Sequence, residues 1–141
     1  MVITFIGHRE VFEEEKVRKW VRNCILSQKD SEMIFFCGGC GAFDLLCARV
    51  CSELKPELEK SEIVYVTPYL DRCADQPLLY DTVLYPSIED VPLRWAIIKR
   101  NRYMIENADL VIAYIRHSFG GAYQSYLFAK RKGKRILRYG E

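Results

Sequence analysis

Short apolar runs alternate along the chain with longer stretches of helical periodicity. The apolar runs predict strands at 2–6, 33–37, 63–66, 110–115 and 135–138, with a weaker candidate at 80–85. The intervening stretches predict helices, one from about Glu13 and others over 43–54, 93–107 and 121–132. In the first of these, Val17, Val21 and Cys24 share one helical face. Strands that alternate with helices are typical of a parallel sheet with crossover helices.

The pattern predicts an α/β fold, a Rossmann-like three-layer sandwich with a mostly parallel central sheet of five to six strands flanked by helices. A length of 141 residues suits one domain, and no repeat or linker divides the chain, so 1–141 is expected to fold as a unit. The segment 68–92 breaks the rhythm with four prolines and three tyrosines. A connection of this length is usually functional, and we expect a lid or a dimer contact. Its tyrosines either stack a base or cover the core.

Composition and charge narrow the classes of partner. Half of the residues are hydrophobic and 28% are charged, which indicates a globular protein. A net charge of +2 lacks the strong basic field of a non-specific nucleic-acid binder, so a nucleic-acid partner is not expected. No apolar run approaches the ~20 residues of a membrane span, and the first residues lack the features of a secretory signal. These features predict a cytoplasmic protein without a membrane partner.

Glycine-bearing turns follow three of the predicted strands. Their glycines are Gly7 after the first strand, Gly38, Gly39 and Gly41 after the second, and Gly120 and Gly121 after the strand at 110–115. Ligands bind beyond the carboxyl ends of strands in open α/β sheets, and these turns would gather there. Glycine lets backbone N–H groups approach a phosphate at a helix N-terminus. The alternative is that the glycines only make tight turns.

Polar residues near these turns are further candidates for a binding site. Arg9 has a planar guanidinium that suits phosphate. His8 either contributes to the site or bonds a neighbouring backbone carbonyl. Asp44 either accepts a ribose hydroxyl or favours the helix dipole. Arg100 is expected as a counter-charge, and Asn101 either caps a backbone group or reaches the ligand.

Four of the six cysteines, Cys37, Cys40, Cys47 and Cys51, fall within fifteen residues. A zinc site is disfavoured because Cys37 would end a strand while Cys51 lies three turns along the following helix. A redox role for Cys37 and Cys40 is the second alternative, because a helix N-terminus lowers the pKa of a thiol. We expect the cysteines to be reduced and mainly to fill the core, with no metal bound.

Several of these motifs occur together in a known superfamily. Gly7-His8-Arg9, the Gly-Gly-x-Gly-x-x-Asp run of 38–44, Arg100-Asn101, the run 105–113 and Gly120-Gly121 resemble the SLOG superfamily, especially its small single-domain, YpsA-like members. The resemblance covers nearly the whole chain. It implies a Rossmann-like sheet that binds nucleotides or their derivatives, in a bacterial protein that forms a homo-oligomer, with a dimer as the expected state. The superfamily also includes DNA-processing proteins and cytokinin-activating phosphoribohydrolases.

One departure from the superfamily bears on catalysis. Its hydrolases carry a glutamate just after the late glycine pair, where this chain has Gln124. An amide cannot serve as nucleophile or general base. The leading hypothesis is therefore binding or sensing of a nucleotide or nucleotide-derived small molecule without turnover and without a cofactor. The alternatives are an enzyme that cleaves an N-glycosidic or phosphoester bond, with His8, Asp44 or Glu106 as acid or base, and a protein-interaction module built on 68–92.

Overall fold

The structure is a computed structural model that describes residues 1–70 and 73–141. Its strands match the apolar runs of the sequence to within three residues at each end. In chain order they are β1 (Val2–Gly7), β2 (Glu32–Cys37), β3 (Lys60–Val66), β4 (Thr82–Leu84), β5 (Leu110–Tyr114) and β6 (Arg135–Arg138).

Within the described residues these strands form one parallel sheet of six strands in the order β4-β3-β2-β1-β5-β6. The chain builds the sheet outward from β1 to β4, then crosses back and adds β5 on the other side of β1. The strand order therefore reverses between β1 and β5. Beyond the carboxyl ends of strands at such a point, α/β sheets leave a crevice that binds ligands.

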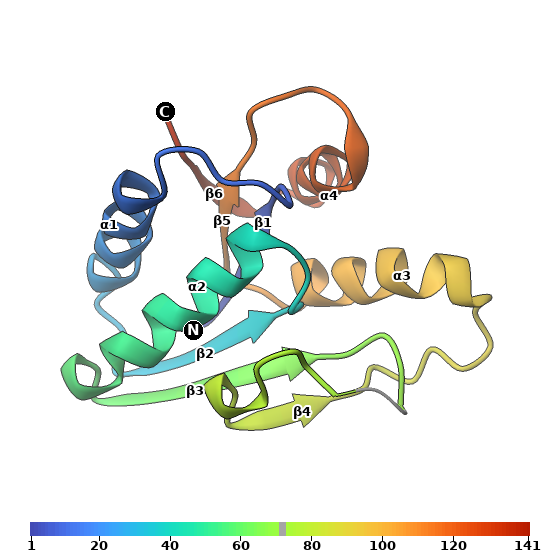
Figure 1. Ribbon diagram of the computed structural model, residues 1–141, viewed down its shortest axis with the longest axis horizontal. Coiled ribbons are helices and arrows are strands. Elements are labelled where there is room, and N and C mark those ends of the chain that lie inside the picture. Colours follow the sequence, from blue (N-terminus) through green and yellow to red (C-terminus); the bar gives the residue numbers. More distant parts are fainter. Residues whose placement is uncertain (71–72) are drawn as a thin grey trace.

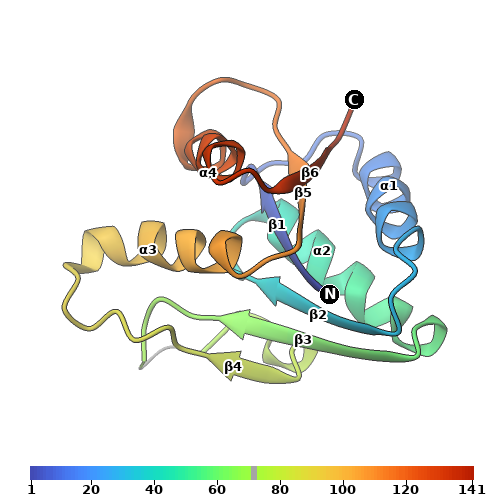
Figure 2. The same cartoon turned by 180° about the vertical axis from the view of Figure 1, so that it is seen from behind.

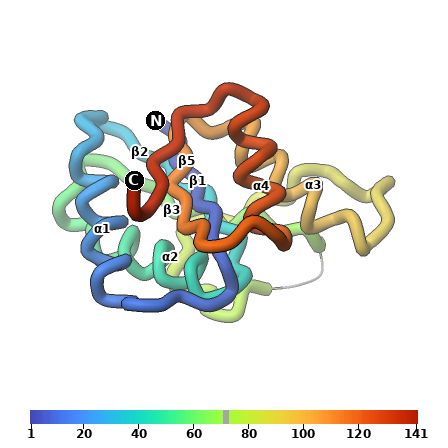
Figure 3. Tube along the Cα trace, turned by 90° about the horizontal axis from the view of Figure 1, so that it is seen from above, coloured from blue at the N-terminus to red at the C-terminus, as the bar shows by residue number. Residues whose placement is uncertain are grey.

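Helices cover both faces of the sheet. They are α1 (Glu14–Leu26), α2 (Ala42–Leu54), α3 (Leu93–Glu106) and α4 (Gly120–Arg131). Figure 1 shows α1 and α2 together on one side, and Figure 3 shows from above that α3 and α4 lie on the opposite side of the strands. Seen from behind, α3 runs beside β2 and then leads into β5 (Figure 2). The predicted Rossmann-like three-layer sandwich is confirmed.

The core has two sides because the strands are buried on both faces, as in parallel sheets generally. Ile3 and Phe5 of β1 pack with the buried faces of α1 and α2, whereas Ile6 packs with Phe128 of α4. Met104 of α3 closes a smaller cluster over β2 and β3. The alternation of side chains along β1 thus decides which residues face the α3–α4 layer.

The segment 68–92 carries short elements of its own. Pro77–Leu79 is a single 3-10 turn, and β4 extends the sheet at the edge where the sequence suggested a weak strand at 80–85. Asp71 and Arg72 of this segment lie outside the described residues. None of the helices in the described ranges is long and apolar enough to cross a membrane.

Candidate functional site

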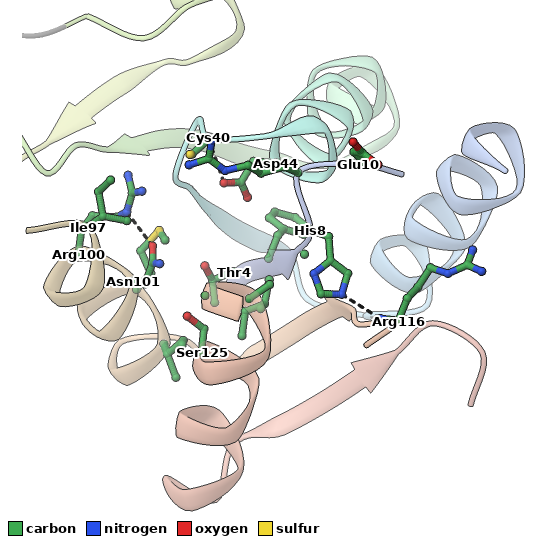
Figure 4. A pocket seen from close by; sticks show the side chains of 18 of the residues that line it. Thr4, His8, Glu10, Cys40, Asp44, Ile97, Arg100, Asn101, Arg116 and Ser125 are labelled. Carbon is green, nitrogen blue, oxygen red and sulfur yellow. Dashed lines mark hydrogen bonds between the residues drawn. The ribbon is translucent and has the colours of Figure 1, made fainter. Parts of the chain in front are cut away.

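A cavity of about 560 Å³ lies where the strand order reverses. It opens beyond the carboxyl end of β1 and is walled by α3, by the start of α2 and by the start of α4. Figure 4 shows Asp44, Asn101, Ser125 and His8 on different sides of it. Its volume falls within the range of roughly 300–1,000 Å³ that is typical of small-molecule sites.

Seven of the eleven residues expected at the site line this cavity. They are Gly7, His8, Arg9, Asp44, Arg100, Asn101 and Gly121. The other four, Gly38, Gly39, Gly41 and Gly120, are not part of its wall. The carboxyl-edge turns therefore converge as expected, but most of the glycines in them do not face the cavity.

Close packing explains why these turns need glycine. A Cβ on Gly7 would lie 2.2 Å from the Phe43 ring. Gly39 has a φ of +64°, and a Cβ there would lie 2.6 Å from Tyr65. These two glycines let β1 and the β2–α2 turn pack tightly. A bulky substitution at Gly39 would strain the fold, so a loss of ligand binding in such a variant could not be assigned to the binding site.

Asp44, in the first turn of α2, is partly buried at the cavity wall. Its Oδ2 accepts a hydrogen bond from the Cys40 N–H at 3.2 Å. Burial raises the pKa of the Asp44 carboxyl to about 6, although the Arg100 guanidinium and the Cys40 N–H both lower it. One amide of the glycine-rich turn is therefore already bonded within the protein. Near neutral pH the Asp44 carboxylate is charged and able to accept a hydrogen bond from a hydroxyl group.

Arg100 holds three elements together at the base of the cavity. It is 2% exposed, and its Nη1 donates to the carbonyl oxygens of Gly38 and Val66, both at 2.8 Å. Its Nε donates to Oδ1 of Asn101 at 2.9 Å. These contacts tie α3 to the ends of β2 and β3. Most N–H donors of Arg100, which was expected to bind a phosphate, are thus used inside the protein. Asn101 orients its guanidinium.

His8, just after β1, accepts a hydrogen bond through Nε2 from the Arg116 N–H at 2.9 Å (Figure 4). Its ring also stacks on His117 with centroids 3.8 Å apart, and His117 stacks on Phe119. Burial, His117 and Arg116 lower the pKa of His8. His8 is therefore a neutral acceptor that connects the β1 and β5 ends of the sheet, rather than a donor to a carbonyl.

Two cations at the cavity have exposed side chains. Arg9 follows β1, and Arg116 follows β5. Neither forms an ion pair with a carboxylate of the described residues. The Arg116 guanidinium lies 5.0 Å from the centre of the Phe12 ring. Nη1 of Arg116 also donates to the Tyr114 hydroxyl at 3.5 Å, but neither charge is neutralised by a carboxylate, so Arg9 and Arg116 are better able than Arg100 to bind an anionic ligand.

The start of α4 closes the cavity with small residues. Gly121, Ala122 and Ser125 line it, and a Cβ on Gly121 would have no neighbour within 4 Å. Gln124 is exposed and is not part of the lining. In the described part of α4, no carboxylate faces the cavity. The acids that line it are Asp44 and Glu10.

Reasoning from the sequence missed several residues of the cavity wall. Arg116 and His117 directly follow β5, so their place after a central strand was the signal that could have found them. Ile97 and Met104 share a helical face with Asn101 and supply apolar surface to the wall, although they were not predicted as site residues. The wall therefore combines charge near the strand ends with an apolar side on α3.

The tyrosines of 68–92 do not reach this cavity. Tyr80 instead packs on Tyr65, with ring centroids 5.2 Å apart, and lines a separate cavity of about 230 Å³ beside Gly39 and Gly41. No described residue of 68–92 lines the large cavity. A lid or dimer contact formed by this segment stays a prediction.

The cysteines mainly fill the core, as expected. Cys37, Cys47 and Cys51 are buried, and burial raises the pKa of each thiol. Cys40 is partly exposed and lines the large cavity, and Cys73 is exposed. Among the described residues, no group of three or more His, Cys, Asp and Glu side chains is arranged to hold a metal.

The fold is similar to that of several solved structures. DNA processing protein A from Helicobacter pylori, described for its single-stranded DNA binding mode, aligns over 98% of this chain and 64% of its own, with a TM-score of 0.68 and 16% identity. DNA processing protein A from Streptococcus pneumoniae aligns over 96% and 49%, with a TM-score of 0.66 and 14% identity. The structural-genomics target TM1055 aligns over 96% and 71%, with a TM-score of 0.62 and 15% identity.

These likenesses show the fold alone, because the identities are low. The chain spans less than two thirds of the length of both DNA processing proteins. No family model matches the sequence, and no curated protein matches it significantly. The shared architecture is a Rossmann-like α/β fold.

Proposed function

We propose that this protein binds a nucleotide or nucleotide-derived anion in the cavity between β1, α3 and α4, without turnover. The observation that carries the proposal is the composition of that cavity. Exposed Arg9 and Arg116 are part of its lining, Asp44 lies at its wall, and α3 supplies an apolar side. A phosphorylated nucleoside has the matching parts, namely an anion, hydroxyl groups and a flat apolar base.

Each part of such a ligand has a partner in the cavity. The guanidinium groups of Arg9 and Arg116 bind phosphate. In the described structure only Oδ2 of Asp44 is hydrogen-bonded, which leaves Oδ1 for a ribose hydroxyl. The base packs against Ile97 and Met104. The proposal includes membership of the SLOG superfamily, as a YpsA-like, homodimeric cytoplasmic protein, on the strength of the sequence motifs.

Hydrolysis of an N-glycosidic bond is the alternative, and the cavity favours it less. Asp44 and Glu10 line the cavity, but the start of α4 presents Gly121, Ala122 and Ser125 rather than a carboxylate. Glu106 is exposed at the end of α3 and is not part of the lining. If the protein released a free base from a nucleoside monophosphate, and Asp44→Asn abolished that release, the hydrolase alternative would replace the proposal of binding without turnover.

Thermal unfolding against AMP, cyclic nucleotides, NAD and ADP-ribose tests the proposal. A ligand at ~100 times its Kd adds about 2.7 kcal/mol to the free energy of unfolding, which raises Tm by several degrees. No shift with any of these compounds would contradict the proposal.

Gly121→Leu locates the site once a compound shifts Tm. The added side chain enters open space at the cavity wall, so the fold is kept while the ligand is excluded. We expect the ligand-induced shift to disappear. The matched control is Gln124→Leu, one turn along the same helix and outside the cavity, which should keep the full shift. An unchanged shift in Gly121→Leu would place the ligand elsewhere.

A further inference from the structure

The charges of this chain are strongly segregated along the sequence. Residues 93–138, which form α3, β5, α4 and β6, contain eleven Lys and Arg residues but only two acids, Glu106 and Asp109. The remainder contains ten Lys and Arg residues and seventeen Asp and Glu residues. The small net charge of +2 is the result of this cancellation. Such asymmetry indicates an anionic partner for the basic part.

Folding gathers much of the positive charge on the outer side of α3 and α4. Figure 3 shows these two helices side by side on one side of the sheet. The exposed cations of these helices that we group as the basic face are Arg94, Lys99, Arg102, Arg131 and Lys132.

Three of these cations converge on one aromatic ring. The guanidinium groups of Arg102 and Arg131 lie 5.1 Å and 5.9 Å from the centre of the Phe128 ring, and Nζ of Lys132 lies 5.4 Å from it. Arg102 comes from α3, whereas Arg131 and Lys132 come from the end of α4. The two helices therefore present one continuous positive surface.

No carboxylate in the described structure neutralises the basic face. The ion pairs of the described residues all connect other parts of the molecule, such as Arg18 of α1 with Glu53 of α2, and Arg22 of α1 with Glu57 in the 3-10 turn after α2. Like charges held close together repel, and the contacts with Phe128 offset only part of that repulsion. A multiply charged anion would relieve it at several positions at once.

An exposed aromatic residue extends this surface along α3. Trp95 is 48% exposed, and the Arg94 guanidinium lies 5.8 Å from the centre of its ring. Trp95 and Arg102 are seven residues apart, about 10 Å along the helix. A positive track with an accessible flat ring matches the surfaces that hold single-stranded nucleic acids, where bases stack on aromatic side chains and the backbone meets cations.

We propose that the basic face binds the phosphate backbone of a single-stranded nucleic acid, with an unpaired base stacked on Trp95. A membrane surface fits this face less well. Membrane-surface helices insert a broad apolar face, whereas Ala96 and Met104 of α3 are buried, and its exposed apolar residues, Leu93, Trp95 and Ile98, are interspersed with Arg94 and Lys99. This site is separate from the cavity, although α3 contributes to both.

Fluorescence anisotropy with a fluorescein-labelled 20-nucleotide oligo-dT strand, at several salt concentrations, tests the proposal. Arg131→Gln combined with Lys132→Gln should weaken binding several-fold. It should also reduce the slope of log affinity against log salt by about 1.4, because each lost phosphate contact on a single strand contributes about 0.7. The matched control, Lys19→Gln with Lys29→Gln, removes the same charge from exposed sites on the other side and should change little.

Trp95→Ala tests the stacking part of the proposal. It should weaken binding of the strand while leaving the salt slope unchanged, because it removes no charge. Thermal unfolding of each variant checks that the fold is kept.

Equal loss of affinity for the strand in both double variants would overturn the placement on the basic face. Equal affinity for a duplex, together with no effect of Trp95→Ala, would overturn the single-stranded specificity. Preferential binding to phosphatidylserine vesicles, lost in Arg131→Gln with Lys132→Gln, would assign the face to membranes.

Discussion

Asp44 and His8, two titratable residues of the same cavity, have pKa values shifted in opposite directions. Each shift favours the neutral form of the side chain. Burial is the first cause in both, because it disfavours charge in an acid and in a base alike. It raises the pKa of Asp44 and lowers that of His8. The neighbouring Arg100 reduces the effect at Asp44, whereas Arg116 and His117 add to it at His8.

The shift at Asp44 predicts a pH dependence of stability. Its folded-state pKa of about 6 lies above the ordinary value of 3.8, so the folded protein holds this proton more tightly than the unfolded chain. The Asp44 contribution to the free energy of unfolding therefore falls by about 2–3 kcal/mol as pH rises from about 4 to about 6. In Asp44→Asn, which keeps an acceptor for the Cys40 N–H, this fall should be absent.

Urea unfolding of the two proteins between pH 4 and pH 8 measures this difference. His8 contributes with the opposite sign, because its lowered pKa gives stability that is lost as pH falls below its ordinary value of 6.5. Subtracting the Asp44→Asn curve from that of the wild type removes this common contribution. The exposed Asp90→Asn is the control and should leave the curve unchanged. Parallel curves for the wild type and Asp44→Asn would refute the shift.

Among the elements, α3 contributes to the core, to the cavity and to the basic face. Its buried side carries Arg100 and Met104, its cavity side carries Ile97 and Asn101, and its outer side belongs to the basic face. The helix is attached to β2 and β3 by the apolar cluster around Met104 and by the buried guanidinium of Arg100.

Arg100→Met should therefore destabilise the protein strongly. The carbonyl oxygens of Gly38 and Val66 would lose their donor, at a cost of about 1–3 kcal/mol for each buried group. We expect the free energy of unfolding to fall by about 3 kcal/mol or more. The exposed neighbour Lys99→Met should change it by less than about 0.5 kcal/mol. Chemical unfolding measures both, and similar values for the two variants would contradict the structural role given to Arg100.

At the scale of the whole molecule, the cavity and the basic face are two separate sites on one layer of helices. Arg131 and Lys132 do not line the cavity, and Gly121 is not part of the basic face. Changes at positions that share no partner are expected to be additive within about 0.5 kcal/mol.

The two proposed sites should accordingly respond independently. Arg131→Gln with Lys132→Gln should keep the full Tm shift produced by the cavity ligand while it loses affinity for the oligo-dT strand. Gly121→Leu should show the reverse. Measuring both readouts on both variants separates failure of one proposal from failure of the other. Loss of both activities in either variant would show that the sites are coupled or are one site.

The sequence by itself determined the elements and the edge at which the candidate site lies. Each strand and helix shows its own hydrophobic period, which depends only on neighbouring residues, and the glycine turns mark the strand ends. The weak edge strand β4 was also visible, within the run at 80–85. His8, Arg9 and Asp44 were predicted at the site because each lies next to such a turn or on the helix that follows, whereas Asn101 was predicted from the superfamily motif.

Only the tertiary structure decided what these groups contact. It used Arg100 to hold the ends of β2 and β3, and it turned Tyr80 away from the large cavity. It also brought Arg102 of α3 next to Arg131 at the end of α4. The net charge of the chain does not reveal this local concentration of positive charge. These outcomes depend on the order of strands in the sheet and on helix packing. Both follow from contacts between residues far apart in the chain, which local periodicity does not record.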